Sequence, residues 1–319
     1  MTNPVLRPLE SPPTRLTVAV SGATGLIGSA IVRVLIQRGN VVRPLVRRPA
    51  KTMDEISWDP ERETIDASRL AGVDAIINLA GESLAQRWSD NVKQAIRDSR
   101  VKGTTTLARA IASLDQKPRA LLSGSAMGIY GIRGNETLDE SSTLGDDFLA
   151  SVAKDWEAAT QPAIDAGIRV VHLRTGLVVS PNGGALPKML LPFRMGVGGK
   201  LGDGKQWMSW IALTDYVEAV TFLLDSASIA GPVNLVAPNP VTNEEFTRVL
   251  ARVLRRPAFF HVPRAALTLT MGEMAEATVL ASQRIRPRRL LEAGFNFSLP
   301  TLEAALRAEF TRSARSDDR

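Results

Sequence analysis

Cysteine is absent from the 319-residue chain. Its absence excludes disulfide bonds, a thiolate nucleophile, and Cys-ligated zinc or iron–sulfur centres. Histidine occurs only at His172 and His261, which excludes a metal site built from several histidines. No apolar run reaches the ~18 residues of a membrane span, and residues 1–15 hold four prolines and no apolar stretch typical of a secretory signal. We therefore predict a cytoplasmic protein with a disordered leader over residues 1–14, no membrane partner and no bound metal.

Positive charge is only slightly in excess, at +6 for 39 Lys and Arg against 33 Asp and Glu. Most of this excess lies in residues 251–319, where twelve arginines face seven acidic residues. The densest run, residues 284–289, lacks the interleaved aromatic side chains expected of a nucleic-acid surface. We interpret it as a solvated face, with contact to an anionic ligand as the alternative, and expect no nucleic-acid partner.

Short runs of β-branched and apolar residues alternate with longer stretches of helical periodicity. The runs that indicate buried strands are residues 16–21, 41–46, 74–80, 120–123 and 169–173. Helical spacing of apolar residues covers residues 25–38, 89–114 with an interruption at Gly103, and 148–166. This alternation is typical of right-handed βαβ units. The predicted fold class is α/β, a doubly wound parallel sheet of the Rossmann type.

The alternation weakens after residue 176, where glycines crowd the stretch up to residue 204. Such glycine density indicates loops that approach a ligand or pack closely. Helical patterns then return at residues 244–254, 265–281 and 302–310. We predict a dinucleotide-binding domain over 15–180 and a smaller, mostly helical C-terminal region over 181–319. Its helical tail would span about 240–312, and strands from 205–236 are available to join the sheet.

Three glycines lie where the first predicted strand gives way to the first predicted helix. Gly22 permits a tight turn, Gly25 allows the backbone to approach a pyrophosphate, and Gly28 allows the helix to pack against the strand. The N-terminus of the helix offers free N–H groups and partial positive charge to the phosphates. The predicted cofactor-binding residues here are Gly22, Ala23, Thr24, Gly25, Leu26, Ile27 and Gly28.

The end of the second predicted strand discriminates between the two nicotinamide dinucleotides. A site that prefers NAD places a carboxylate there to bind the ribose 2′-hydroxyl. This chain has Arg47 and Arg48, with no carboxylate before Asp54. Two guanidinium groups suit a 2′-phosphate, although both could be solvated loop residues. The sequence therefore predicts NADP(H).

The glycine spacing, together with Asn78-Leu-Ala-Gly81, resembles the extended and atypical short-chain dehydrogenase/reductase superfamily. More narrowly, the chain is similar to bacterial "epimerase family proteins", which resemble sugar-nucleotide epimerases and carry a small C-terminal domain of unknown function. The segments that carry this narrower likeness are 56–60, 78–82, 98–100, 154–157, 191–194, 238–246 and 285–289. The resemblance implies further cofactor contacts from Leu79, Ala80, Gly81, Glu82, Arg100, Ser123, Lys154, Thr175 and Gly176.

The resemblance also implies a catalytic Ser, Tyr and Lys, with the Tyr four residues before the Lys on one helix face. Ser125 and Lys154 match two of them, but Ala150 occupies the place of the tyrosine. Tyr130 is the tyrosine nearest Ser125 in the sequence, and we predict that it or a water molecule supplies the proton. Arg100 stands where the superfamily commonly has an asparagine, which weakens the usual proton relay.

Sugar-nucleotide epimerases have an arginine for the substrate pyrophosphate at the position of Met208. Its loss makes a nucleotide-sugar substrate less favoured, and Trp207 and Trp210 would line an apolar pocket or belong to the core. We predict an NADP(H)-dependent oxidoreductase or epimerase acting on a small carbonyl or hydroxyl compound. The alternative is a non-catalytic protein that senses NADP(H). The sequence leaves the substrate and the oligomeric state open, a homo-oligomer included.

Overall fold

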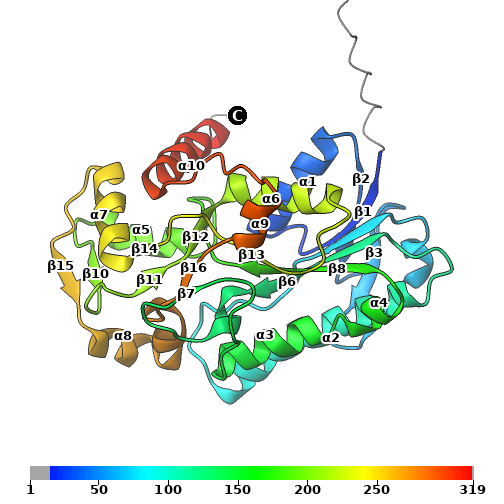
Figure 1. Cartoon of the computed structure of the whole chain (residues 1–319), viewed down its shortest axis with the longest axis horizontal. Helices are drawn as coiled ribbons and strands as arrows, with labels where there is room; N and C mark the ends of the chain where they lie inside the picture. Colours follow the sequence, from blue (N-terminus) through cyan, green and yellow to red (C-terminus); the bar gives the residue numbers. More distant parts are fainter. Residues whose placement is uncertain (1–14, 318–319) are drawn as a thin grey trace, which may run out of the picture.

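The computed structural model describes residues 15–317, so the predicted leader lies outside the described residues. An eight-stranded sheet forms the centre of the molecule (Figure 1), and every neighbouring pair of its strands is parallel except β3 and β4. Its strands, in spatial order, are β13 (Gly231–Leu235), β8 (Arg169–Thr175), β6 (Ala120–Ala126), β5 (Ala75–Asn78), β1 (Thr17–Ser21), β2 (Val41–Val46), β3 (Ile56–Asp59) and β4 (Thr64–Ile65). The predicted doubly wound sheet is confirmed.

Helices cover both faces of this sheet (Figure 1). One face carries α1 (Leu26–Gln37) and α6 (Leu213–Asp225), and the other carries α2 (Asp90–Ala112), α3 (Phe148–Ala158) and α4 (Gln161–Asp165). Side chains of β1 alternate between the two cores: Val18 and Val20 belong to one cluster, and Ala19 to the other. The continuous apolar run of β1 is therefore explained by burial on both faces.

Three predicted helices differ from the structure. Gly103 does not interrupt α2, which runs from Asp90 to Ala112 and buries this glycine next to Trp58. The predicted helix 148–166 is two helices, since Pro162 lacks the N–H that would continue α3 and instead starts α4. The predicted helix 265–281 ends as α8 (Arg264–Met271) at Gly272, whose φ is +65°, and is followed by a π-helical turn over Ala275–Val279.

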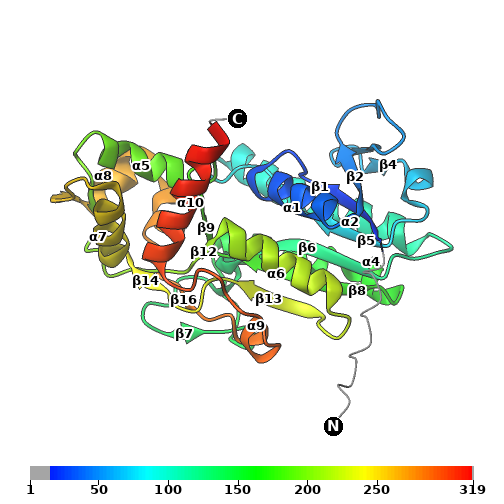
Figure 2. The same cartoon turned by 90° about the horizontal axis from the view of Figure 1, so that it is seen from above.

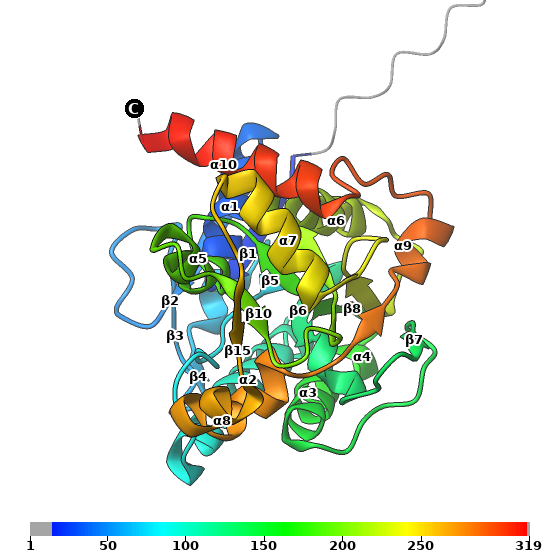
Figure 3. The same cartoon turned by 90° about the vertical axis from the view of Figure 1, so that its left-hand side faces the viewer.

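The C-terminal part of the chain builds a third core. Trp210 and Phe246 are buried there among apolar side chains of α5 (Leu186–Arg194), α7 (Asn243–Leu254) and α10 (Leu302–Asp317). Figures 2 and 3 show α7 and α10 side by side, and Figure 3 shows α8 at a distance from both. Four small two-stranded sheets tie this part together: β10 (Gly199–Leu201) with β15 (Phe260–Val262), β11 (Trp207–Met208) with β14 (Val241–Thr242), β12 (Trp210–Ala212) with β9 (Leu177–Val179), and β16 (Arg284–Ile285) with β7 (Thr137–Leu138).

The arginine run 284–289 is solvated in part, since Arg286 and Arg288 are exposed, but the run also makes contacts within the protein. Arg289 donates hydrogen bonds to the carbonyl oxygens of Ala230 and Pro232 at 2.6 and 2.7 Å. Arg288, at the start of α9 (Arg288–Glu292), pairs with Asp139 at 3.1 Å. The run therefore fastens the tail to the edge strand β13 and to the turn after β7.

Candidate cofactor site

The carboxyl ends of β1, β5 and β6 meet at one edge of the sheet. From β1 the chain continues to β2 on one side, whereas β5 lies on the other side of β1. Ligands of doubly wound sheets bind at such a switch point, outside the carboxyl ends of the strands. Thr24, Gly25, Gly81 and Glu82 are all exposed at this edge, so the predicted phosphate loop and the loop after β5 face open space together.

The three loop glycines differ in what an added side chain would contact. Gly22 has φ +67°, and a Cβ there would lie 3.1 Å from the backbone of Leu79. A Cβ on Gly28 would lie 2.1 Å from the carbonyl oxygen of Gly22, so only glycine allows α1 to approach the end of β1. A Cβ on Gly25 would meet protein only at 3.4 Å. No protein atom therefore requires glycine at position 25, and the open side is where a ligand would approach.

The first N–H groups of helix α1 have neither a capping side chain nor an acidic residue near them. Its N-cap residue, Gly25, provides no side-chain acceptor, and the first turn has no acidic residue. By contrast, Ser89 and Asp147 cap α2 and α3 with side-chain oxygens. The first N–H groups of a helix have no intrahelical partners and carry partial positive charge. An anionic group such as a pyrophosphate fits this end.

A buried chain of hydrogen bonds holds the loop in place. Ser21 Oγ donates to Asn78 Oδ1 at 2.6 Å and accepts from the N–H groups of Leu79 and Ala80. Asn78 Nδ2 and Trp156 Nε1 both donate to Thr104 Oγ1 at 2.9 Å. This network joins β1, β5, α2 and α3. Sequence reasoning missed Ser21, Thr104 and Trp156. Only Ser21 had a local signal, as a polar residue at the end of an apolar run.

Arg47 and Arg48 both lie after β2, but only Arg48 has an ion-pair partner. Glu55 accepts two hydrogen bonds from Arg48, at 2.7 and 2.5 Å, and one from the N–H of Lys51. The Arg48 hydrogen bond lowers the pKa of Glu55 to about 2. Arg47 is exposed and forms no hydrogen bond or ion pair with another described residue. Sequence reasoning missed Glu55, which lies seven residues along the chain from Arg48.

Ser125, near the end of β6, is joined to a buried ion pair. Its Oγ donates to Glu157 Oε1 at 2.7 Å, and Arg174 donates to both carboxylate oxygens of Glu157, at 2.8 and 3.0 Å. Burial alone would raise the pKa of Glu157, but the Arg174 guanidinium outweighs burial and keeps that pKa below its ordinary value. Glu157 is therefore ionised at neutral pH and orients the Ser125 hydroxyl. Neither Glu157 nor Arg174 was predicted as a site residue.

The structure places Tyr130 in the core. Its side chain is fully buried, its hydroxyl donates to Asn234 Oδ1 at 2.7 Å, and Arg174 donates to it at 3.0 Å. Burial raises the pKa of Tyr130 to about 12. Because its proton already serves a buried acceptor, this arrangement favours a packing role over the proton-donor role predicted from the sequence.

The other predicted site residues differ in burial and in hydrogen bonding. Lys154 is half-buried and forms no hydrogen bond or ion pair with a described residue, while Ala150, in place of the tyrosine, is fully buried. Ser123 Oγ is buried without a partner among the described residues. Thr175 Oγ1 lies 3.0 Å from the Tyr216 hydroxyl. Gly176 serves packing, since a Cβ there would meet Val236 at 2.6 Å.

Met208 places an uncharged thioether where the epimerases have an arginine. Met208 Sδ accepts a hydrogen bond from Asn243 Nδ2 at 3.5 Å. Trp210 is fully buried and belongs to the third core. Trp207 is half-buried beneath the Arg284 guanidinium, which lies 4.3 Å from its ring centroid. Of the two tryptophans, only Trp207 remains available to contact a ligand.

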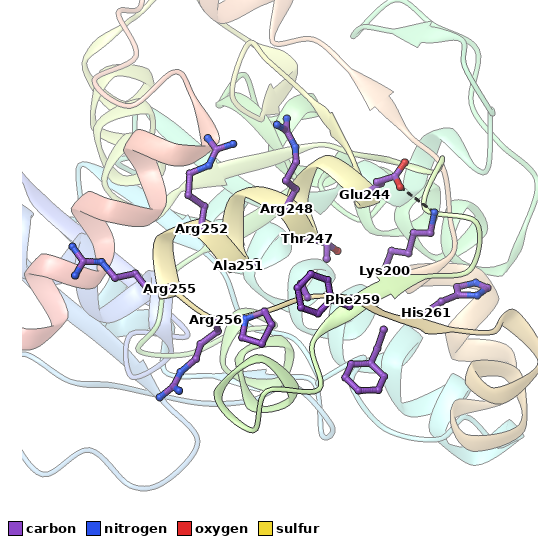
Figure 4. Close-up of a pocket in the computed structure, with 13 residues that line it drawn as sticks. Lys200, Glu244, Thr247, Arg248, Ala251, Arg252, Arg255, Arg256, Phe259 and His261 are labelled. Atoms are coloured by element: carbon purple, nitrogen blue, oxygen red, sulfur yellow. Dashed lines mark hydrogen bonds and ion pairs between the residues drawn. The ribbon is translucent and has the colours of Figure 1, made fainter.

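A separate hollow of about 640 Å³ lies over α7 and β15 (Figure 4). Arginines of α7 and the residues that follow it line this hollow, and Lys200 pairs with Glu244 at 3.0 Å within it. None of its lining residues was predicted to contact the cofactor. Over residues 15–317, no helix has both the length and the apolar character needed to cross a membrane.

Known proteins resemble the chain over most of its length. "Epimerase family protein Mb2239" of Mycobacterium bovis is 43% identical over 92% of this chain and 98% of its own length. The crystal structure of human epimerase family protein SDR39U1 (isoform 2) with NADPH superposes with a TM-score of 0.85 at 34% identity, covering 92% of this chain and 98% of that one. A nucleoside-diphosphate sugar epimerase from Corynebacterium glutamicum gives a TM-score of 0.77 at 38% identity, covering 96% of this chain and 62% of that one.

Two family models divide the chain between them. Residues 262–309 match a domain of unknown function, DUF1731. Residues 18–237 match the model of the NAD dependent epimerase/dehydratase family. This range includes every strand of the central sheet except the first residue of β1. The resemblance stated from the sequence is confirmed, and the chain belongs to the NAD dependent epimerase/dehydratase family.

Proposed function

We propose that this protein binds NADP(H) at the carboxyl ends of β1, β5 and β6, as an oxidoreductase or epimerase for a small carbonyl or hydroxyl compound. The observation that carries the proposal is the N-terminus of α1, which has no capping side chain and no acidic residue and opens onto exposed Thr24 and Gly25. NADPH in the crystal structure of human SDR39U1 supports the same cofactor here. The pyrophosphate would accept hydrogen bonds from the first N–H groups of α1.

The 2′-phosphate would lie between Arg47 and Arg48. Glu55 already neutralises much of the charge on Arg48, whereas Arg47 has no partner among the described residues. We therefore assign the larger part of the discrimination against NAD(H) to Arg47. The Arg48–Glu55 pair would shape the loop and contribute a weaker contact.

Substitution of these residues tests the assignment. Arg47→Ala is expected to weaken NADPH binding by about 10- to 100-fold, because a charge-assisted contact is lost, while NADH binding changes little. Arg48→Ala should weaken NADPH binding less, and Glu55→Gln should tighten it by releasing Arg48. Dissociation constants from quenching of tryptophan fluorescence give all three values. Equal losses of NADPH and NADH affinity in Arg47→Ala would contradict the assignment.

The chemistry would be centred on Ser125. When bound, the nicotinamide supplies or accepts a hydride. The Ser125 hydroxyl donates its hydrogen bond to ionised Glu157 at 2.7 Å. The lone pairs of Ser125 Oγ are therefore free to accept a hydrogen bond from a substrate hydroxyl. As the substrate is oxidised, its hydroxyl proton would move to Ser125 Oγ while the Ser125 proton moves to Glu157 Oε1. Lys154, which forms no hydrogen bond or ion pair with a described residue, would bind ribose hydroxyls.

A second candidate function is NADP(H) sensing without catalysis. It is favoured by fully buried Ala150 in place of the tyrosine and by Tyr130, whose hydroxyl is already committed to Asn234. Transfer of deuterium from labelled NADPH to a panel of aldehydes and ketones decides between the two. Transfer that disappears in Ser125→Ala supports the enzyme, whereas tight binding without transfer to any compound supports the sensor.

A further inference from the structure

Arg100 carries a positive charge near the loop that follows β5. No carboxylate of a described residue forms an ion pair with it. It lies on α2, with Nη1 donating to the carbonyl oxygen of Ile96 at 2.9 Å and Nη2 to that of Glu82 at 3.0 Å. The exposed Glu82 carboxylate raises the pKa of Arg100 through its charge, but it outweighs burial only in part and forms no ion pair with Arg100 in the described structure. A guanidinium has five N–H donors, and these two bonds leave three for another acceptor.

A comparison with Arg174 shows how unusual this state is. Arg100 is half-buried and Arg174 is buried, but only Arg174 binds both oxygens of a carboxylate, that of Glu157. Burial lowers the pKa of Arg100 to about 10, whereas Glu157 raises the pKa of Arg174 in spite of its burial. Buried charges in proteins are normally paired, because desolvation without a partner is costly. Arg100 therefore has the properties of a group whose partner arrives with a ligand.

The position of Arg100 indicates which ligand. Its Cζ lies 5.1 Å from the centroid of the Trp156 ring, and a Cβ on exposed Gly81 would lie 3.3 Å from that Cζ. The same Trp156 ring would be 2.7 Å from a Cβ on Gly124, the residue before Ser125. The Trp156 ring thus lies between Arg100 and the end of β6, where Ser125 is placed.

We propose that Arg100 binds a carboxylate of the substrate, so that the substrate class is a small hydroxy or oxo acid with its reacting oxygen at Ser125. This proposal rests on the proposed function. A guanidinium and a carboxylate form two parallel hydrogen bonds. The Arg100 guanidinium lies over the Trp156 ring and is held by the carbonyl oxygens of Ile96 and Glu82. The cofactor pyrophosphate is assigned to α1 and does not need Arg100.

The test uses the full chain saturated with NADPH and follows the fluorescence of the nicotinamide. Oxamate, malonate, succinate and glutarate are titrated in turn, with acetamide and succinamide as uncharged probes. We expect saturable binding of at least one acid and none of the amides. Arg100→Gln should weaken the binding of that acid at least 10-fold while the NADPH dissociation constant stays within threefold of the wild-type value. Arg109→Gln, an exposed position on the same helix, should change neither.

A second variant guards against a loss of folding. Arg100→Lys keeps the charge but not the fork, and we expect it to weaken acid binding at least threefold with an unchanged melting temperature. Equal acid binding in wild type and variants, or binding of no acid, would overturn the proposal while NADP(H) binding stands. A loss of NADPH affinity of 10-fold or more in Arg100→Gln would also overturn it and assign Arg100 to the cofactor. If the wild type binds no NADPH, the proposed function fails, and this inference fails with it.

Discussion

Gly25→Ala is expected to weaken NADPH binding by about 100-fold, or about 2.8 kcal/mol, and to leave the free energy of unfolding nearly unchanged. The added methyl group would meet protein only at 3.4 Å, an ordinary contact, and the φ of Gly25 is −73°, which any residue adopts. The methyl group would instead occupy the space through which the pyrophosphate reaches the N–H groups of α1. Calorimetric titration with NADPH and unfolding in urea give the two quantities.

Two further variants make this result specific to the ligand. Gln37→Ala changes an exposed residue at the far end of α1 and should affect neither quantity. Gly28→Ala places a Cβ 2.1 Å from the Gly22 carbonyl oxygen, so it should destabilise the fold by about 1–3 kcal/mol or more as well as abolish binding. NADPH binding by Gly25→Ala with wild-type affinity would mean that the phosphates bind elsewhere.

Glu157→Gln is expected to destabilise the protein by about 3–5 kcal/mol, the usual cost of removing one partner of a buried ion pair. Arg174 is only 4% exposed and would keep its charge without a counter-ion. Equilibrium unfolding in urea at neutral pH measures the loss. The control is Glu136→Gln, which breaks an exposed pair with Arg133 and should cost less than about 1 kcal/mol. Equal stability of the two variants would contradict a buried charge pair at this place.

The Glu157–Arg174 pair should make the folded protein less stable in acid. The pKa of Glu157 is lowered in the folded protein, so its contribution to stability is present above the ordinary glutamate pKa and is lost as the pH falls through the lowered value. In acid the wild-type protein should therefore lose the part of its unfolding free energy that the Glu157→Gln variant already lacks at neutral pH. The difference in unfolding free energy between them should shrink as the pH falls, which urea titrations at several acidic pH values check.

The sequence predicted the parts of the molecule whose signals are local. The strand β1, the helix α1 and the glycines where they join form one continuous segment, so the pattern that predicts them can be seen without knowledge of the fold. Buried strands are likewise visible as short apolar runs, because a parallel sheet covered on both faces buries consecutive residues. These signals depend on neighbours in the chain and need no knowledge of distant contacts.

Contacts between distant segments carried the features that the sequence did not predict. Glu157 and Arg174 lie on a helix and a strand that only the folded sheet brings together. Tyr130 is likewise buried where its hydroxyl donates a hydrogen bond to Asn234 of β13. Arg289 reaches the edge strand β13 across more than fifty residues. The arginine run therefore appeared solvated, because charge composition alone does not reveal a carbonyl acceptor contributed by another element.

The most direct test of the account is amide hydrogen exchange with and without saturating NADPH, followed by mass spectrometry. Phosphates bound at the N-terminus of α1 would slow the exchange of N–H groups in residues 22–28 and in the exposed loop of residues 79–82, and would leave α7 unchanged. Saturation by NADPH with unaltered exchange in residues 22–28 would contradict the account, because the phosphates would then be bound by another part of the chain.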